Sequence, residues 1–134
     1  MNAAISQKLK ELKETLPGVL IEKHFKINPA LKEKYSEERI KLYQEDTRYH
    51  LSYLAESISV DEPELFNEYL IWVKTFFANL PVTDEEIIEN LELLDETITQ
   101  HLPENMSAVT SKFINEGIKR YKNEPGIQAS FLNE

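Results

Sequence analysis

Four residues with polar-tipped rings are the side chains best suited to holding a small molecule: His50, Tyr53, Tyr69 and Trp72. Each combines an apolar ring with a group that can form a hydrogen bond. If they lie on two consecutive helices joined by a short turn, their rings converge between the helices. This arrangement predicts either a ligand pocket, with His50 as its hydrogen-bonding or axial group, or an aromatic core whose polar tips are satisfied at the rim. We expect Trp72 to contribute mainly to packing and His50 to line a polar recess beside it.

Other patterns that could support metal binding or catalysis are weak. His24, His50 and His101 lie on separate segments, and Asp46, four residues before His50, is the only carboxylate one helical turn ahead of a histidine. The chain has no cysteine, no glycine-rich phosphate loop and no nucleophile elbow. We therefore predict no metal site, no catalytic residues and no enzymatic activity. A haem bound through His50 is an alternative if the fold is globin-like.

The elements that must position these rings are predicted to be helices. The chain has only three glycines and is rich in Leu, Glu and Lys, which favours an all-α fold. A first helix is expected over about residues 2–15, ended by Pro17 and Gly18. The segment from Val19 to Pro29 could be a helical turn, an extended connector or a packed loop. Four long helices are then predicted at about residues 36–58, 61–80, 84–102 and 103–123.

Capping residues and prolines set the boundaries of these four helices. Ser36, Asp61 and Thr83 are the predicted N-caps, and Pro81 is expected to end the second helix. The first of the four should bury a stripe rich in rings, consisting of Tyr49, His50, Tyr53, Leu54, Ser57 and Ile58. The second should bury a broad apolar face, consisting of Leu65, Phe66, Tyr69, Leu70, Val73, Phe76, Phe77 and Leu80.

Short connections between the four helices favour antiparallel neighbours and hence an antiparallel bundle of four long helices plus an N-terminal helix. A globin-like arrangement, in which the last two helices are antiparallel and earlier ones cross them steeply, uses the same helices. The 134 residues are enough for one compact domain. We expect residues 1–35 to form an N-terminal helix and connector, residues 36–123 the four-helix core, and residues 124–134 a linker-like tail.

The formal charge of −9 is concentrated in the middle of the chain. Residues 61–104 contain twelve acidic residues and one basic residue, Lys74, which argues against nucleic acid as a partner. This acidic stretch predicts either solvated helix faces or a docking surface for a basic partner domain. With no apolar run long enough to span a bilayer and no secretory signal, the chain is expected to be cytoplasmic and to have no membrane partner.

An ordered set of three motifs suggests a family. Residues 50–54 read His-Leu-x-Tyr-Leu, residues 66–72 read Phe-x-x-Tyr-x-x-Trp, and residues 90–94 read Asn-Leu-x-x-Leu. Over roughly residues 45–121 the chain resembles the N-terminal helical region of bacterial cobalamin-binding regulatory proteins. The resemblance implies a non-enzymatic sensory, regulatory or protein-interaction domain that passes its signal through helix packing or a dimer face.

The partners implied by this resemblance are a C-terminal effector or cobalamin-binding domain, with a possible homodimer. The family's cobalamin-binding hallmark, Asp-x-His-x-x-Gly, does not occur in this sequence. We therefore expect no cofactor in this chain, because cobalamin would belong to a separate C-terminal domain, and we expect the chain to be an N-terminal domain or a fragment. The alternative function is that of a small-molecule- or haem-binding helical domain with a pocket near His50 and Trp72.

Overall fold

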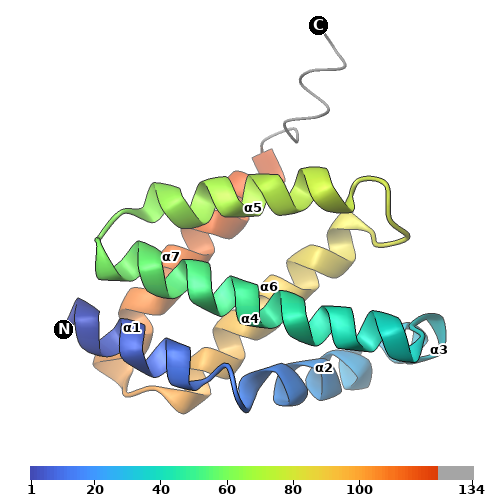
Figure 1. Ribbon diagram of the computed structural model, residues 1–134, viewed down its shortest axis with the longest axis horizontal. Helices are drawn as coiled ribbons and strands as arrows, with labels where there is room; N and C mark the ends of the chain where they lie inside the picture. The colour runs from blue at the N-terminus through green and yellow to red at the C-terminus, as the bar shows by residue number, and fades with distance from the viewer. Residues whose placement is uncertain (124–134) are drawn as a thin grey trace, which may run out of the picture.

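The computed structural model describes residues 1–123, and its regular structure there consists of helices alone (Figure 1). The seven helices are α1 (Asn2–Glu11), α2 (Leu16–Ile27), α3 (Pro29–Lys34), α4 (Glu37–Ser59), α5 (Pro63–Phe77), α6 (Asp84–His101) and α7 (Glu104–Asn123). The predicted all-α helical bundle is confirmed. The predicted linker-like tail, residues 124–134, lies outside the described residues.

The helices pack as two antiparallel pairs that cross each other. Figure 1 shows α4 and α5 running in opposite directions, with α6 and α7 passing obliquely behind them. The last helix, α7, contacts α4, α5 and α6, whereas α6 packs mainly on α2 and α7. The N-terminal part completes the core, because α1 packs on α4 and α2 packs on both α4 and α6. The expectation that each long helix packs beside its neighbour in sequence therefore fits α4 with α5 and α6 with α7.

A glycine sits where α7 crosses α5. A Cβ atom added at Gly117 would lie 2.7 Å from Leu70 Cδ1 and 3.0 Å from Phe66 Cδ2. Both neighbouring side chains are fully buried, so neither has free space into which it could move. The absence of a side chain at Gly117 thus allows the close approach of α5 and α7.

Two of the predicted N-caps are confirmed. The Ser36 hydroxyl accepts a hydrogen bond from the Arg39 amide at 3.1 Å, and the Thr83 hydroxyl accepts one from the Glu86 amide at 3.1 Å. Each bond satisfies an amide that has no carbonyl partner in the first helical turn. These caps fix the starts of α4 and α6.

The third predicted N-cap, Asp61, is wrong. Asp61 has a φ of 53° and lies just after the end of α4, where its amide bonds to the carbonyl of Ile58 at 3.1 Å. The next amide, that of Glu62, bonds to the carbonyl of Ser57 at 2.9 Å. These two bonds form a Schellman motif that terminates α4. The N-cap of α5 is Glu62, with Pro63 at the start of the helix, where its missing N–H costs nothing.

Prolines elsewhere also act differently from the prediction. The first helix ends at Glu11 rather than residue 15, and Pro17 lies in the first turn of α2. A proline in a first turn is tolerated because its nitrogen would have no helical partner there. The segment from Val19 to Pro29, for which the sequence left three alternatives, is therefore mostly helical. At the other end, α5 stops at Phe77 rather than at residue 80, and residues 78–81 form turns.

The apolar face of α5 is wider than the surface that its neighbours cover. Phe66 and Leu70 are fully buried, whereas Leu65, Phe76 and Leu80, which were expected to be buried, are exposed. On α4, Tyr49 and Tyr53 are likewise about half exposed, which corrects the predicted buried stripe. No helix in residues 1–123 is long and apolar enough to cross a membrane.

Candidate functional site

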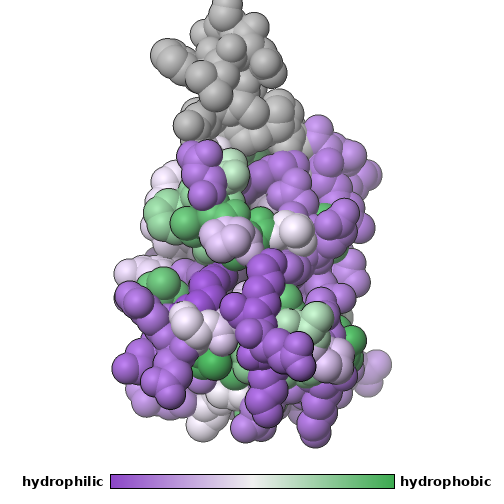
Figure 2. Space-filling model, turned by 90° about the vertical axis from the view of Figure 1, so that its right-hand side faces the viewer, coloured by the Kyte–Doolittle hydropathy of each residue, from purple (hydrophilic) through white to green (hydrophobic). Residues whose placement is uncertain are grey.

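An open cleft of about 580 Å³ lies between α4 and α5. We refer to it as the aromatic groove, and its lining residues are Arg39, Leu42, Glu45, Asp46, Tyr49, His50, Tyr53, Tyr69, Trp72, Val73, Phe76, Phe77, Leu80 and Pro81. All four ring residues predicted as ligand contacts lie in it. Figure 2 shows apolar surface at the height of α5 in Figure 1, bordered by hydrophilic side chains.

A row of nearly parallel rings forms one wall of the aromatic groove. Tyr53 and Tyr69 stack with centroids 4.2 Å apart and planes 12° apart. Tyr69 is followed along α5 by Trp72 at 6.5 Å, and Trp72 by Phe76 at 5.2 Å. The three α5 rings share a face because they are spaced by three and four residues. The row brings one α4 ring and three α5 rings into a single apolar wall.

Trp72 is not a core residue, so the expectation that it contributes mainly to packing is wrong. Its side chain is 53% exposed, and that of Tyr53 is 46% exposed. Trp72 lies beside Tyr69 and Phe76 at the margin of the apolar face of α5, where it lines the groove. Helical periodicity indicated the apolar face but could not indicate which edge of it a neighbouring helix would cover.

His50 lies at the inner side of the aromatic groove and is only 4% exposed. Its Nδ1 is 2.6 Å from the hydroxyl of Tyr69. Burial lowers the pKa of His50 to about 4, and a hydrogen bond with the Asn90 side chain acts in the opposite direction. The imidazole is therefore neutral at pH 7. Nδ1 is engaged by Tyr69 and the ring is almost fully buried, so a haem bound through His50 would have to displace this contact.

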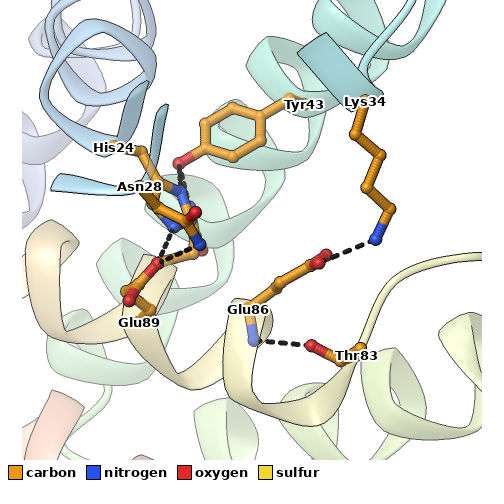
Figure 3. Close-up of polar contacts among 8 residues, drawn as sticks. His24, Asn28, Lys34, Tyr43, Thr83, Glu86 and Glu89 are labelled. Carbon is orange, nitrogen blue, oxygen red and sulfur yellow. Dashed lines mark hydrogen bonds and ion pairs between the residues drawn. The ribbon is translucent and has the colours of Figure 1, made fainter. Parts of the chain in front are cut away.

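The hydrogen bonds continue from Asn90 through the core to the far side of the bundle. Asn90 Nδ2 donates to the hydroxyl of Tyr43 at 2.7 Å, and this hydroxyl is 2.8 Å from His24 Nδ1. His24 Nε2 is 2.7 Å from Glu89 Oε1, which also accepts a bond from Asn28 at 3.3 Å. Figure 3 shows His24 of α2 and Asn28, the residue that follows α2, meeting Tyr43 and Glu89. Burial raises the pKa of Tyr43.

The donors in this network all point in one direction. A carboxylate only accepts, so His24 donates from Nε2 to Glu89 and accepts at Nδ1 from Tyr43. The Asn90 amide nitrogen donates to Tyr43, so the Asn90 oxygen is the group that can accept from His50 and raise the pKa of the imidazole. The neutral His50 therefore accepts at Nδ1 from Tyr69. We refer to the resulting series as the polar chain, and its members in order are Tyr69, His50, Asn90, Tyr43, His24 and Glu89.

A small recess adjoins the aromatic groove, with which it shares Arg39, Asp46 and His50. Its volume is about 30 Å³, which is enough for one water molecule, and it is lined by His50, Tyr43 and Asn90 from the polar chain. Arg39 and Glu86 also line it, and one buried polar atom of each, Arg39 Nε and Glu86 Oε2, has no hydrogen-bond partner among the described residues. The recess is thus bordered by polar groups of α4 and α6.

The polar end of the aromatic groove is formed by side chains of α4. Asp46 lies 3.7 Å from the Arg39 guanidinium, measured between Oδ2 and Nη1. The same guanidinium lies over the rings of Tyr35 and Phe77, 5.1 and 5.5 Å from their centroids. Burial raises the pKa of Asp46 to about 6; Arg39 opposes this shift and Glu45 adds to it. Two carboxylates and one guanidinium therefore define this end.

Asp46 and His50 give opposite contributions to the dependence of stability on pH. The pKa of His50 falls from 6.5 to about 4 on folding, so the unfolded chain binds an extra proton in this window and stability rises with pH, by up to about 3 kcal/mol. The pKa of Asp46 rises from 3.8 to about 6, so the folded protein holds an extra proton there and stability falls with pH.

These contributions largely cancel between pH 4 and 6 in the unaltered protein. A variant that removes one of the two groups should therefore reveal the pH dependence that the other contributes. We expect the stability of Asp46→Asn to rise from pH 4 to 6.5 and that of His50→Gln to fall from pH 4 to 6. Urea unfolding at pH 4, 5, 6 and 7, followed by circular dichroism, measures both slopes. Profiles of the two variants that run parallel to each other would contradict this assignment.

Sequence reasoning did not identify most of the polar chain. His24 was considered only as a metal ligand, and Tyr43, Glu89 and the side-chain role of Asn90 were not considered. The sequence contained one signal of these contacts. Each of the two histidines in the polar chain is followed 19 residues later by the tyrosine to which it is hydrogen-bonded, His24 by Tyr43 and His50 by Tyr69. The pairing of α4 with helices on either side of it explains this repeated interval.

Comparisons with known proteins add no functional assignment. No protein-family model, no curated protein and no solved structure matches the chain. The resemblance to cobalamin-binding regulators consequently stays a prediction. Within residues 1–123, no group of three or more His, Asp or Glu side chains is arranged to hold a metal ion. The geometry of the aromatic groove is therefore the main basis for a functional proposal.

Proposed function

We propose that this chain is a non-enzymatic sensory domain that binds a small, flat aromatic molecule in the aromatic groove. The observation that carries the proposal is the row of rings along a cleft of about 580 Å³, in which Tyr53, Trp72 and Phe76 are about half exposed and Tyr69 is buried. This volume lies within the range of about 300–1,000 Å³ that is usual for small-molecule sites. Flat rings in such a cleft favour a flat apolar ligand.

The polar groups at the groove support binding rather than catalysis. His50 and Tyr69 are hydrogen-bonded to each other, burial lowers the pKa of His50 to about 4 and raises that of Tyr69, so neither side chain is prepared to act as a base. The polar chain supports a sensory role because it joins Tyr69 in the groove to His24 on α2. Attachment to an effector or cobalamin-binding domain rests on the sequence resemblance alone.

The experiment uses N-phenyl-1-naphthylamine, a neutral flat dye whose fluorescence increases in apolar sites. We expect saturable binding of one dye per chain. Tyr53→Ala and Trp72→Ala should each weaken binding by about tenfold, because each removes part of the ring wall. Leu65→Ala is the matched control, since Leu65 is 44% exposed on the same helix but lies outside the groove.

Equal losses in all three variants, or dye binding that does not saturate, would contradict the proposal. Dye binding that disappears as the protein concentration rises, together with a dimer in sedimentation, would show that a second copy of the chain occupies the groove. That outcome would also overturn the proposal and would favour the alternative of a dimer interface.

A further inference from the structure

We infer that the ligand of the aromatic groove is a small aromatic cation whose positive group carries N–H donors, as an amidinium does. The inference deepens the proposed function and depends on it. It rests on the hydrogen-bonding character of the groups at the inner and polar sides of the groove, which offer acceptors to a ligand.

Tyr69 offers the groove an acceptor. Its hydroxyl lies 2.6 Å from His50 Nδ1 and, as the more acidic partner, donates its single proton to the neutral imidazole. The Tyr69 oxygen therefore presents lone pairs to a ligand. The polar chain maintains this direction of donation, since the proton of each member is already directed to the next member.

The acidic side chains of α4 also offer acceptors. Asp46 and Glu45 both line the groove, and ionised carboxylates accept hydrogen bonds only. The one cationic group in the lining, Arg39, has its guanidinium over the rings of Tyr35 and Phe77 and beside Asp46. With two carboxylates and one guanidinium, the groove has a net negative charge at neutral pH.

These acceptors and the ring wall line the same cleft. An aromatic ligand can therefore lie along Trp72 and Tyr53 while its charged group reaches Asp46 and the Tyr69 oxygen. N–H donors from a cation to a carboxylate form stronger hydrogen bonds than neutral donors do. The positive group would thus provide orientation and discrimination, whereas the ring wall would provide apolar contact.

The test compares three probes that have nearly the same shape. They are 2-naphthamidine, which is a cation, 2-naphthamide, which is neutral, and 2-naphthoate, which is an anion. Calorimetric titration at pH 7.5 should give the tightest binding for the amidine, by about tenfold over the amide, with the carboxylate weakest. Binding of the amidine should also weaken as the pH falls from 7 to 5, because Asp46 becomes protonated there. The charged or titratable groups near this carboxyl come from four parts of the chain: Tyr35, then Arg39, Tyr43, Glu45 and His50 of α4, Tyr69 of α5 and Glu86 of α6.

The variant Asp46→Asn should remove most of the preference for the amidine over the amide while leaving binding of the amide nearly unchanged. Glu68→Gln is the matched control, because it makes the same change of net charge at an exposed α5 position outside the groove. Tyr69→Phe should also reduce the preference, because the ring remains and the oxygen acceptor is lost.

The outcomes separate this inference from the proposed function. If the amide or the carboxylate binds as tightly as the amidine, the groove binds aromatic molecules but the inference of a cation is wrong. If none of the three probes binds, the proposed function fails as well. If Glu68→Gln reduces the preference as much as Asp46→Asn does, the effect comes from net charge and the assignment to Asp46 is wrong.

Discussion

Replacing Asn90 by leucine is expected to lower the free energy of unfolding by about 2–4 kcal/mol. The leucine side chain has a similar size, so the loss comes from hydrogen bonds rather than from packing. The variant leaves the Tyr43 hydroxyl without its donor and His50 without the partner of its second nitrogen. Each unpaired buried group costs about 1–3 kcal/mol. Urea unfolding at pH 7, followed by circular dichroism, measures the change.

The structure offers a matched control in Asn67→Leu. Asn67 and Asn90 are both 8% exposed, but the Asn67 side-chain oxygen is buried without a hydrogen-bond partner among the described residues. Removing an unpaired oxygen should be nearly neutral or stabilising. Equal destabilisation by the two substitutions would show that the polar chain makes no special contribution to stability.

Phe66→Ala is expected to destabilise the protein by about 3–5 kcal/mol, whereas Trp72→Ala on the same helix should cost less than about 1 kcal/mol. Phe66 is fully buried and packs where α5 crosses α7, so its removal leaves a cavity. Trp72 is 53% exposed and loses mainly contacts with Tyr69 and Phe76. Thermal unfolding of the two variants measures the difference.

A Trp72→Ala variant that unfolds as readily as Phe66→Ala would place the indole in the core and contradict the open groove. Ligand binding should show the reverse order in variants that remain folded. Trp72→Ala should weaken dye binding, and Leu70→Val, a small change in the buried stripe of α5, should leave it unaltered.

Local sequence signals predicted the helical fold well. Ser36 and Thr83 lie before runs that begin with acidic residues, and each caps its helix as these patterns indicate. Asp61 followed the same rule and was misread, because its residue type is suited both to an N-cap and to the left-handed position that ends a helix. Whether Asp61 caps α5 or ends α4 depends on the length of the loop before Pro63, which the local preference of one residue does not determine.

Contacts between distant residues could not be predicted in the same way. The four rings of the proposed pocket were identified because they lie on consecutive helices, so a short turn brings them together. The covering of α6 by α2, and hence the bond between His24 and Glu89, depends on how the helix pairs cross. Periodicity determines the faces of helices but not their crossing angles. The part of the polar chain that runs from Asn90 to Glu89 therefore could not be predicted.

The seven-residue spacing between Tyr43 and His50 limits where the chain can tolerate an insertion. These residues lie seven positions apart on α4, so they share a face at a separation of about 10 Å, and Asn90 bonds to both. One extra residue between them would turn every later α4 side chain by about 100° and detach His50 from both Asn90 and Tyr69. The same insertion in the turn between Ala78 and Val82 would change only loop length. The stretch from Tyr43 to His50 should thus keep its length among natural variants of this protein.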